Sequence, residues 1–268
     1  MSDSVSLRGR RWFEALAGDA PLLPGGPASV LAADVPLGGE AVRAIAVVPD
    51  PHNRFPRARS GEIGLDEGWA IAARVREAAA VPGRPVLAIV DVPSQAYGRT
   101  EELLGLYLAC AAAVDAYASA RLDGHPVVAL VVGNALSGAF LAHGYQANRV
   151  LALDDPGVSI HAMGKAAAAR VTRRSVADLE RLGETILPLA YDVRSFARLG
   201  LLHELISGVD ADAPTAADVA RVRERLAAAI ADARRGPPDL AGRLASEDAR
   251  RNRAASIRVR EQLAREWN

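Results

Sequence analysis

The sequence has few cysteines, lysines and aromatic residues, and it carries no excess charge of either sign. Its single cysteine, Cys110, excludes a disulfide framework and a cysteine-based metal site. Lys+Arg 32 balances Asp+Glu 32, so no global positive field exists to hold a nucleic acid or an anionic membrane. Apolar runs such as Val127 to Val132 are far too short to span a bilayer. The first residues are charged and lack the apolar stretch of a signal peptide, so we expect a cytoplasmic protein.

The remaining composition is that of a globular protein. Half of the 268 residues are hydrophobic, and 23 Gly and 16 Pro interrupt the chain too often for a coiled coil. A chain of this length buries a sizeable core. We therefore predict one α/β domain over residues 1–268, with a core at about 29–205 and a helical extension at about 206–268.

An alternation of short apolar runs and helical segments predicts a largely parallel sheet. Ser29–Val35 and Val42–Val48 flank a Pro/Gly turn and indicate paired strands. Pro85–Val92 and Val127–Val132 are nearly continuous apolar runs, typical of strands that are covered on both faces. Strand, helix and strand at this spacing favour parallel pairing with right-handed crossovers.

One long helix is expected between those two buried strands. Thr100 is a suitable N-cap, and the helix should end at Asp123-Gly124. Its apolar stripe is Leu103, Leu106/Tyr107, Cys110, Val114 and Tyr117.

The other expected segments complete the α/β pattern. They are a loop (Pro49–Gly64), a helix with Trp69, Ile71 and Val75 inside (Asp66–Ala80), a turn and short helix after Val132 reaching about Ala147, two strands (Arg149–Leu153 and Val158–His161), and helices at Ala166–Arg170, Val176–Ile186, Leu189–Leu199, Thr215–Arg234 and Leu240–Glu266. The last helix has many charges and few large apolar residues, so we expect it to pack on a partner rather than on its own core.

Two turns that follow the buried strands are candidates for binding an anion. Pro93-Ser94-Gln95 follows one strand, and Leu136-Ser137-Gly138-Ala139 follows the next. Small residues let a ligand approach the backbone, and free N–H groups at the start of a helix favour an anion or a developing oxyanion. Adjacent parallel strands bring both turns to one end of the sheet, where open α/β sheets bind ligands. The alternative is that Ser-Gly-Ala only permits tight helix–strand packing.

Other chemistries have weaker support. A nucleophile elbow needs Gly-x-Ser-x-Gly, but Ala135 and Ala139 flank Ser137, so a strained turn is not expected there. No glycine-rich dinucleotide fingerprint or P-loop is present. Lys165 offers a cation for a phosphate or a carboxylate. No two histidines have metal-ligand spacing, so no metal is expected; the five are His52, His125, His143, His161 and His203.

Several separated motifs carry a resemblance to a known family. The run VDVPSQAYGRTEELLGLYLACAAAVDAYASARLDGHPVVALVVGNALSGAF resembles the C-terminal half of biotin-dependent acyl-CoA carboxyltransferases. Those proteins have an Asp-x-Pro-Gly-Phe turn and a Gly-Gly-Ala turn, where this chain has Ser94-Gln95 and Ser137-Gly138-Ala139. SQAYGR, SGAFLAHGYQANR, LDDPG and HAMGKAAAARVTRRS resemble the gamma subunits of biotin-independent malonate decarboxylases. The resemblance implies the ClpP/crotonase fold of repeated ββα units.

The resemblance also implies a heteromeric carboxy-lyase. A malonyl group would be held as a thioester on the CoA-like prosthetic arm of an acyl carrier protein, with no cofactor bound by this chain. A beta subunit and this chain would together decarboxylate it to the acetyl thioester, with the active site between them. A separate alpha subunit, an acyltransferase, would exchange malonate for acetate on the carrier.

Loss of CO2 leaves negative charge on the thioester oxygen, so the reaction needs pre-aimed donors rather than a base. We assign that role to the backbone amides of Gly138, Ala139, Ser94 and Gln95, with the Ser137 hydroxyl as a further donor. A proton must then reach the new methyl carbon; the candidates are His161, Tyr97 and His143, in that order. The residues expected to contact the substrate are Tyr97, Gly98, Met163, Gly164 and Lys165.

Two other functions remain open at this point. The chain is alternatively a self-sufficient crotonase-type hydratase or isomerase of acyl-CoA, although no convincing Glu stands near Ser137 in the sequence. It is alternatively a scaffold that completes a partner's site and contributes no donors.

Overall fold

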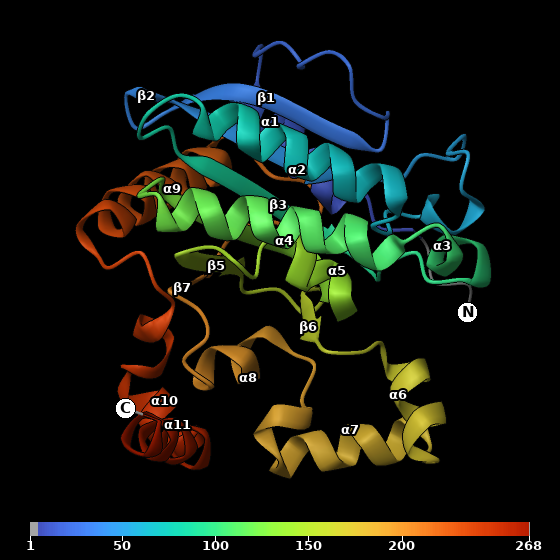
Figure 1. The fold of residues 1–268 in the computed structure, drawn as a ribbon, viewed down its shortest axis with the longest axis vertical. Coiled ribbons are helices and arrows are strands. Elements are labelled where there is room, and N and C mark those ends of the chain that lie inside the picture. The colour runs from blue at the N-terminus through green and yellow to red at the C-terminus, as the bar shows by residue number, and fades with distance from the viewer. Residues whose placement is uncertain (1–4, 268) are drawn as a thin grey trace.

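The apolar runs of the sequence form one mixed sheet of seven strands within residues 5–267, the part of the chain that this computed structural model describes (Figure 1). The strand order is β1-β2-β3-β4-β5-β7, and β6 pairs with the end of β4. The strands are β1 (Val30–Leu37), β2 (Glu40–Val47), β3 (Val86–Val92), β4 (Val127–Leu136), β5 (Arg149–Leu153), β6 (Ser159–His161) and β7 (Glu204–Ile206).

The pairing of these strands confirms the predicted hairpin and the predicted parallel core. β1 and β2 are antiparallel, with Val30 opposite Val47. β2, β3, β4 and β5 are parallel neighbours. Every residue of β3 is buried, as expected for a strand covered on both faces. The register of β3 against β4 shifts between Val90 and Val92, and this irregularity lies where the two strands approach their ends.

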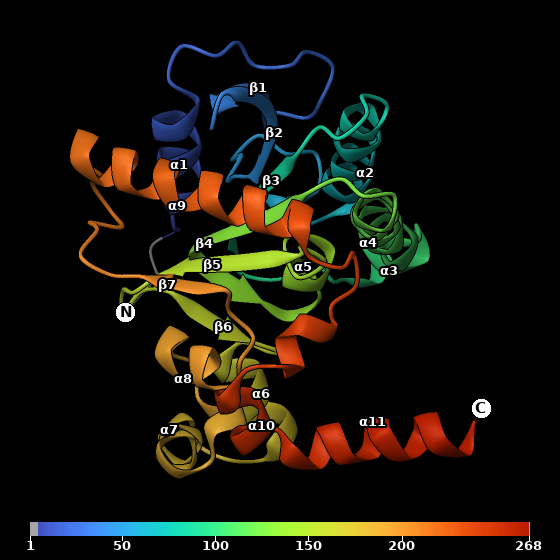
Figure 2. The ribbon, with the colours of Figure 1, turned by 90° about the vertical axis from the view of Figure 1, so that its left-hand side faces the viewer.

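Helices cover both faces of the sheet. Figure 2 shows α2 (Leu65–Ala79) and α4 (Leu106–Leu122) on one side, and α1 (Arg8–Ala17) and α9 (Ala216–Arg235) on the other. α9 buries Val222, Leu226 and Ile230, so it belongs to the main core. The result is a three-layer α/β architecture in which the carboxyl ends of β3 and β4 lie at one edge.

A group of shorter helices lies below the sheet in Figure 1, on the side of β6 and β7. They are α6 (Lys165–Thr172), α7 (Val176–Thr185), α8 (Val193–Arg198) and α10 (Glu247–Asn252). The final helix, α11 (Ala254–Glu266), projects away from the body in Figure 2 and has no buried residue. The expectation that residues 240–266 do not pack on the chain's own core therefore holds for α11 but not for α10, which buries Ala249.

The structure corrects several details of the predicted helices. The expected long helix is two helices, α3 (Arg99–Leu103) and α4, because Gly105 has φ 88° and ends the first. α3 begins after Gly98, so Thr100 lies inside it and is not the N-cap. Leu103 and Tyr107 are exposed, at 78% and 64%. Trp69, expected inside α2, is also exposed.

The segments around the site also differ from the prediction. β4 continues to Leu136, and the turn there is confined to the start of α5 (Ser137–Ala142), which ends before the expected Ala147. The strand β7 was not anticipated, because three residues carry too little pattern to show a period. The expected C-terminal helix is divided into a short 3₁₀ turn, α10 and α11. No helix within residues 5–267 has the length and apolar character required to cross a membrane.

Candidate functional site

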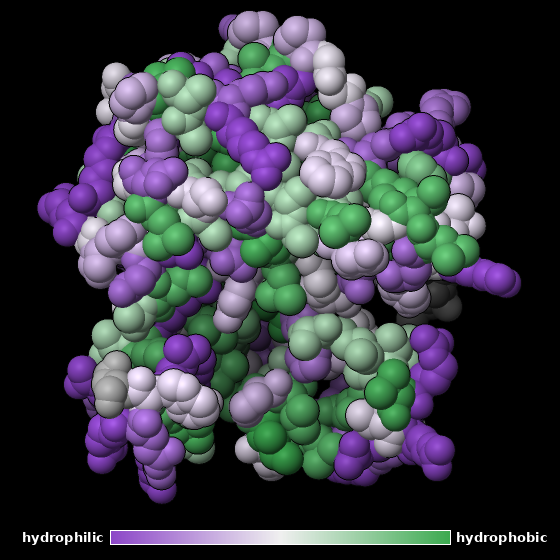
Figure 3. Space-filling model, viewed as in Figure 1, coloured by the Kyte–Doolittle hydropathy of each residue, from purple (hydrophilic) through white to green (hydrophobic). Residues whose placement is uncertain are grey.

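The two predicted strand-end turns meet in one surface cleft. Ser94 and Gln95, after β3, and Ser137 and Gly138, after β4, line a cleft of about 1150 Å³ between the sheet edge and α6. The N–H of Gly138 donates to Oε1 of Gln95 at 3.0 Å, which joins the two turns directly. Figure 3 shows the surface hollowed between the sheet body and the lower helices. The expected convergence of these turns is therefore present in the fold.

A buried carboxylate holds the two turns in register. Asp91, at the irregular point of β3, is 4% exposed. Its Oδ1 accepts the N–H of Asn134 at 2.9 Å, and its Oδ2 accepts the hydroxyl of Ser6 at 2.6 Å and the N–H of Gly9 at 3.0 Å. Each bond replaces water around the buried charge. Asp91 thus connects β3, β4 and α1 directly behind the cleft.

Glycine 133 makes room for that carboxylate. A Cβ atom on Gly133 would lie 2.2 Å from Oδ1 of Asp91 and 2.6 Å from its Cγ. Atoms in contact cannot approach so closely, so a side chain here would displace Asp91. The glycine of the sequence Gly133-Asn134-Ala135 is therefore required by the close approach of β3 and β4.

Ser137 has a backbone conformation that its sequence did not predict. Its φ is +59°, in the left-handed region that non-glycine residues seldom adopt. The expectation that this turn lacks a strained residue is therefore wrong. The flanking alanines do not prevent the strain, because the abrupt change from β4 to α5 falls on Ser137 itself. Strain of this kind costs about 1–3 kcal/mol and is concentrated at functional sites.

The predicted amide donors differ in their availability. The N–H groups of Ser94 and Gln95 have no hydrogen-bond partner within residues 5–267. The N–H of Gly138 is occupied by the Gln95 side chain. Ala139 is fully buried and does not line the cleft. The first turn therefore has two amides without a partner in the described part of the chain, whereas the Gly138 amide is already bonded to Gln95.

The opposite wall of the cleft is the start of α6. This wall consists of Met163, Gly164 and Lys165. Tyr97 lines the cleft on the side of the first turn. Gly98 is adjacent to Tyr97 but is not among the lining residues. The Nζ of Lys165 forms an ion pair with Glu180 at 2.7 Å and lies 5.5 Å from the centre of the Tyr191 ring. The lysine is thus already paired with a carboxylate on α7.

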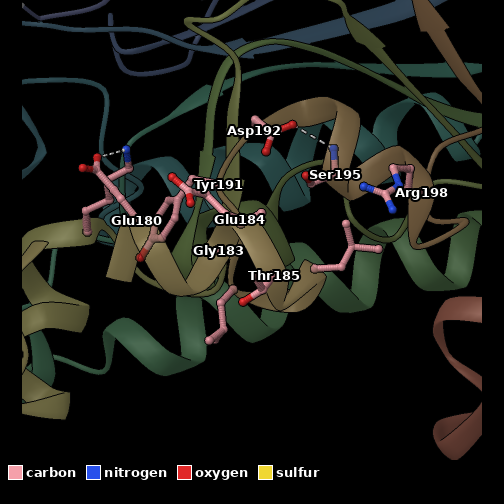
Figure 4. Close-up of a pocket in the computed structure, with 12 residues that line it drawn as sticks. Glu180, Gly183, Glu184, Thr185, Tyr191, Asp192, Ser195 and Arg198 are labelled. Carbon is pink, nitrogen blue, oxygen red and sulfur yellow. Dashed lines mark hydrogen bonds and ion pairs between the residues drawn. The ribbon is translucent and has the colours of Figure 1, made fainter. Parts of the chain in front are cut away.

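A smaller hollow of about 320 Å³ adjoins the cleft between α6, α7 and α8. Figure 4 shows Glu180, Glu184 and Tyr191 around it. Lys165 and Tyr191 line both hollows and form part of the wall between them. The Tyr191 hydroxyl donates to the carbonyl oxygen of Met163 at 2.8 Å, which fixes that wall.

The histidines proposed as proton donors lie outside the cleft. His161 is half-buried, its ring stacks on Tyr191 with centroids 3.9 Å apart, and it does not line the cleft. Burial lowers the pKa of its imidazole. His143 is fully buried, and burial lowers its pKa to about 4. Its Nδ1 lies 2.9 Å from the Tyr117 hydroxyl and its Nε2 lies 3.0 Å from the Ile89 carbonyl oxygen, so its role is structural.

Sequence reasoning missed several residues of the cleft, among them the charged residues Glu62, Asp91 and Arg170. Glu62 and Arg170 line it together with Ser94 and Ser137. Glu62 lies in the loop before α2, and no motif marks it, because only the folded chain brings residues 62 and 94 together. No group of three or more His, Cys, Asp or Glu residues that could hold a metal occurs within residues 5–267.

Comparison with known proteins adds independent information. A family model described as the malonate decarboxylase gamma subunit matches residues 58–267. A malonyl-S-ACP:biotin-protein carboxyltransferase of Malonomonas rubra is 37% identical over 195 residues, which are 69% of this chain and 66% of that protein, slightly less than two thirds of its length.

Solved structures agree with these matches. The chain is 58% identical, with a TM-score of 0.91, to a chain of a Pseudomonas malonate decarboxylase hetero-tetramer in complex with coenzyme A. It is 56% identical, with a TM-score of 0.88, to a chain of the Pseudomonas MdcD–MdcE hetero-dimer; both matches cover 97% of this chain and 99% of the other. Transcarboxylase 12S shares the fold, with a TM-score of 0.64 and 20% identity over 85% of this chain and 40% of the other. This match confirms the predicted crotonase-like fold.

Proposed function

Since this chain belongs to the family of malonate decarboxylase gamma subunits, we propose that it supplies one half of an active site that removes CO2 from a malonyl thioester. A beta subunit supplies the other half, and the Pseudomonas hetero-dimer of two different subunits supports this division. The observation that carries the proposal is the cleft in which Ser94-Gln95 and Ser137-Gly138 converge.

The reaction requires stabilisation of an anion rather than a strong base. The bond between the α-carbon and the carboxylate breaks, and its electron pair passes into the thioester as an enolate. Donors aimed at the enolate oxygen lower this barrier, and loss of one such donor typically costs about 10²–10³ in rate. We assign the Ser94 and Gln95 amides as the donors of this chain, because both are without a partner within residues 5–267.

The second turn acts through a side chain that can be displaced. Gln95 Oε1 is the acceptor for the Gly138 N–H. A substrate oxygen that enters the cleft takes over that acceptor role, and the Gly138 amide then joins the donors. The other donors proposed for the second turn are the Ser137 hydroxyl and the Ala139 amide, although Ala139 is fully buried. The strained Ser137 is the residue that orients this turn toward the cleft.

The remaining walls suit an acyl thioester on a long arm. Met163 and Gly164 form an apolar side, and Tyr97 and Lys165 supply polar contacts at its ends. Gly98 lies beside the rim. We propose that the CoA-like arm of an acyl carrier protein enters here, which agrees with the coenzyme A complex of the Pseudomonas enzyme. An alpha subunit that reloads the carrier with malonate completes the proposed assembly, in which residues 1–268 act as one carboxyltransferase-like unit.

Copurification tests whether the chain acts as part of a heteromeric complex. We expect the tagged chain to copurify with a second crotonase-like subunit and an acyl carrier protein. The complex should release CO2 from the malonyl thioester of that carrier protein. The chain alone should have neither decarboxylase nor acyl-CoA hydratase activity. Hydratase activity of the isolated chain would instead support the self-sufficient enzyme.

Replacement of Gly138 by proline separates a catalytic role from a scaffold role. Proline removes the amide donor at this position. We expect Gly138→Pro to assemble with the beta subunit, measured by size-exclusion chromatography, and to lose about 10²-fold in CO2 release. Full activity of an assembled Gly138→Pro complex would show that the Gly138 amide is not a donor, and would remove this turn as support for a catalytic role over a scaffold role.

A further inference from the structure

The cleft contains a carboxyl group that the reaction as described above does not use. The loop that carries Glu62 runs beside the first turn: the N–H of Ile63 donates to the Ser94 carbonyl oxygen at 3.1 Å, and the N–H of Ala96 donates to the Ile63 carbonyl oxygen at 2.9 Å. Glu62 lines the cleft with Ser94 and Gln95. Its Oε2 accepts the N–H of Ser60 at 2.8 Å, and this bond fixes the side chain.

The surroundings of Glu62 favour its protonated form. Partial burial is the largest influence and raises the pKa of its carboxyl group. The hydrogen bonds from the backbone N–H groups of Glu62 and Ser60 lower it, and the nearby carboxylate of Glu67 on α2 raises it, so the net shift is upward. The other charged side chains that line the cleft are Asp91 on β3 and Lys165 and Arg170 on α6. A partner subunit that covers the cleft removes more water and moves the pKa of Glu62 in the same direction.

The other acids of the site are less suited to donate a proton. Both carboxyl oxygens of Asp91 are already engaged, because they accept three hydrogen bonds from Ser6, Gly9 and Asn134. Tyr97 is half exposed at the rim, where water reaches it. The two histidines considered above do not line the cleft. Glu62 is the acid that combines partial burial, a fixed side chain and proximity to the free amides of the first turn.

We propose that Glu62 is the catalytic acid that protonates the α-carbon after CO2 has left, an inference that rests on the proposed decarboxylase function. The enolate oxygen returns its electron pair to the carbonyl, and the α-carbon takes the proton from the Glu62 carboxyl. One O–H bond breaks, one C–H bond forms, and the acetyl thioester and the Glu62 carboxylate remain. A proton from water restores the acid before the next turnover.

The test compares Glu62 variants in the complex with the beta subunit, with malonyl-CoA and malonyl carrier as the two probes. We expect Glu62→Gln to lower kcat for CO2 release about 10²-fold and to leave KM within about twofold. Its amide oxygen can still accept the Ser60 N–H, so the loop should keep its structure. Glu62→Asp should recover part of the rate. Glu224→Gln, an exposed glutamate on α9, should match the wild type.

The pH profile distinguishes an acid from a merely structural residue. Because the protonated form of Glu62 is the active form, the wild-type kcat should fall as the pH rises through the pKa of Glu62, and Glu62→Gln should lose this limb. A kcat within twofold of wild type for Glu62→Gln would overturn the proposal, as would a wild-type profile without the limb or a slow variant with an unchanged profile. A wild-type complex that releases no CO2 from either probe would instead overturn the proposed function.

Discussion

At the residue scale, the site depends on one buried carboxylate and the glycine that accommodates it. Asp91, on β3, accepts hydrogen bonds from Ser6 just before α1, from Gly9 in α1 and from Asn134 in β4. A single side chain thereby sets the relative position of both strand-end turns. Gly133 lies against Asp91 so closely that the packing permits no Cβ atom.

Gly133→Ala should therefore destabilise the chain. The added methyl forces Asp91 from its bonds, and overpacking of this kind costs about 1–3 kcal/mol. Urea unfolding followed by circular dichroism measures the change. Gly242→Ala is the matched control, because a Cβ there meets no atom within 4 Å, and it should stay within about 0.5 kcal/mol of wild type. Equal stability of the two variants would contradict the role given to Asp91.

Some residues of the site could be predicted from the sequence and others could not. Ser94, Gln95, Ser137 and Gly138 could be predicted, because each follows a long apolar strand and the ends of parallel strands meet. Glu62 could not, because its loop has no period and reaches the site only through pairing with residue 95. The positive φ of Ser137 was also hidden, since the motif rule looks for flanking glycines and not for strain on the serine itself.

At the element scale, α3 and the start of α4 present an unusual apolar surface. Leu103, Leu104, Tyr107 and Leu108 are each more than half exposed, and α3 follows directly after Tyr97 at the cleft rim. Figure 3 shows hydrophobic colour over this part of the molecule. Grouped exposed apolar residues usually mark an interface. The sequence placed Leu103 and Tyr107 of this group in the apolar stripe of the helix, because amphipathic periodicity does not distinguish a core face from a face that meets another chain.

We expect this surface, continuous with the cleft rim, to contact the beta subunit of the proposed complex. The double variant Leu103→Asp/Leu104→Asp should weaken assembly about tenfold or more, measured as the dissociation constant by biolayer interferometry. Its own unfolding midpoint should change little, because both side chains are already in water. Val81→Asp, exposed in the turn after α2, is the control and should bind normally. Unchanged affinity of the double variant would place the interface elsewhere.

At the scale of the whole molecule, the sequence predicted the sheet far better than the C-terminal region. The strands β3, β4 and β5 are long apolar runs whose burial on both faces leaves little ambiguity. Residues 240–266 have many charged and few large apolar side chains, and one continuous helix was predicted there. In the structure the helix is interrupted at Ser246 and Arg253. Ser246 begins α10 as its N-cap, because its hydroxyl accepts the N–H of Ala249 at 3.1 Å. The packing of α10 on α8, in contrast, joins distant segments and leaves no local signal in the sequence.

The two C-terminal helices should therefore contribute very differently to stability. α11 has no buried residue, so a chain that ends at Arg253 should keep the wild-type urea midpoint. A chain that ends at Leu244 also loses α10, whose Ala249 is fully buried and whose Asn252 side chain donates to the Arg198 carbonyl oxygen at 2.7 Å. Gly200 lies directly beneath Ala249, with a φ of +72°, so removal of α10 uncovers a site shaped to receive it. We expect the shorter chain to unfold at a lower urea concentration, and equal midpoints for the two truncations would show that α10 does not stabilise the α8 region.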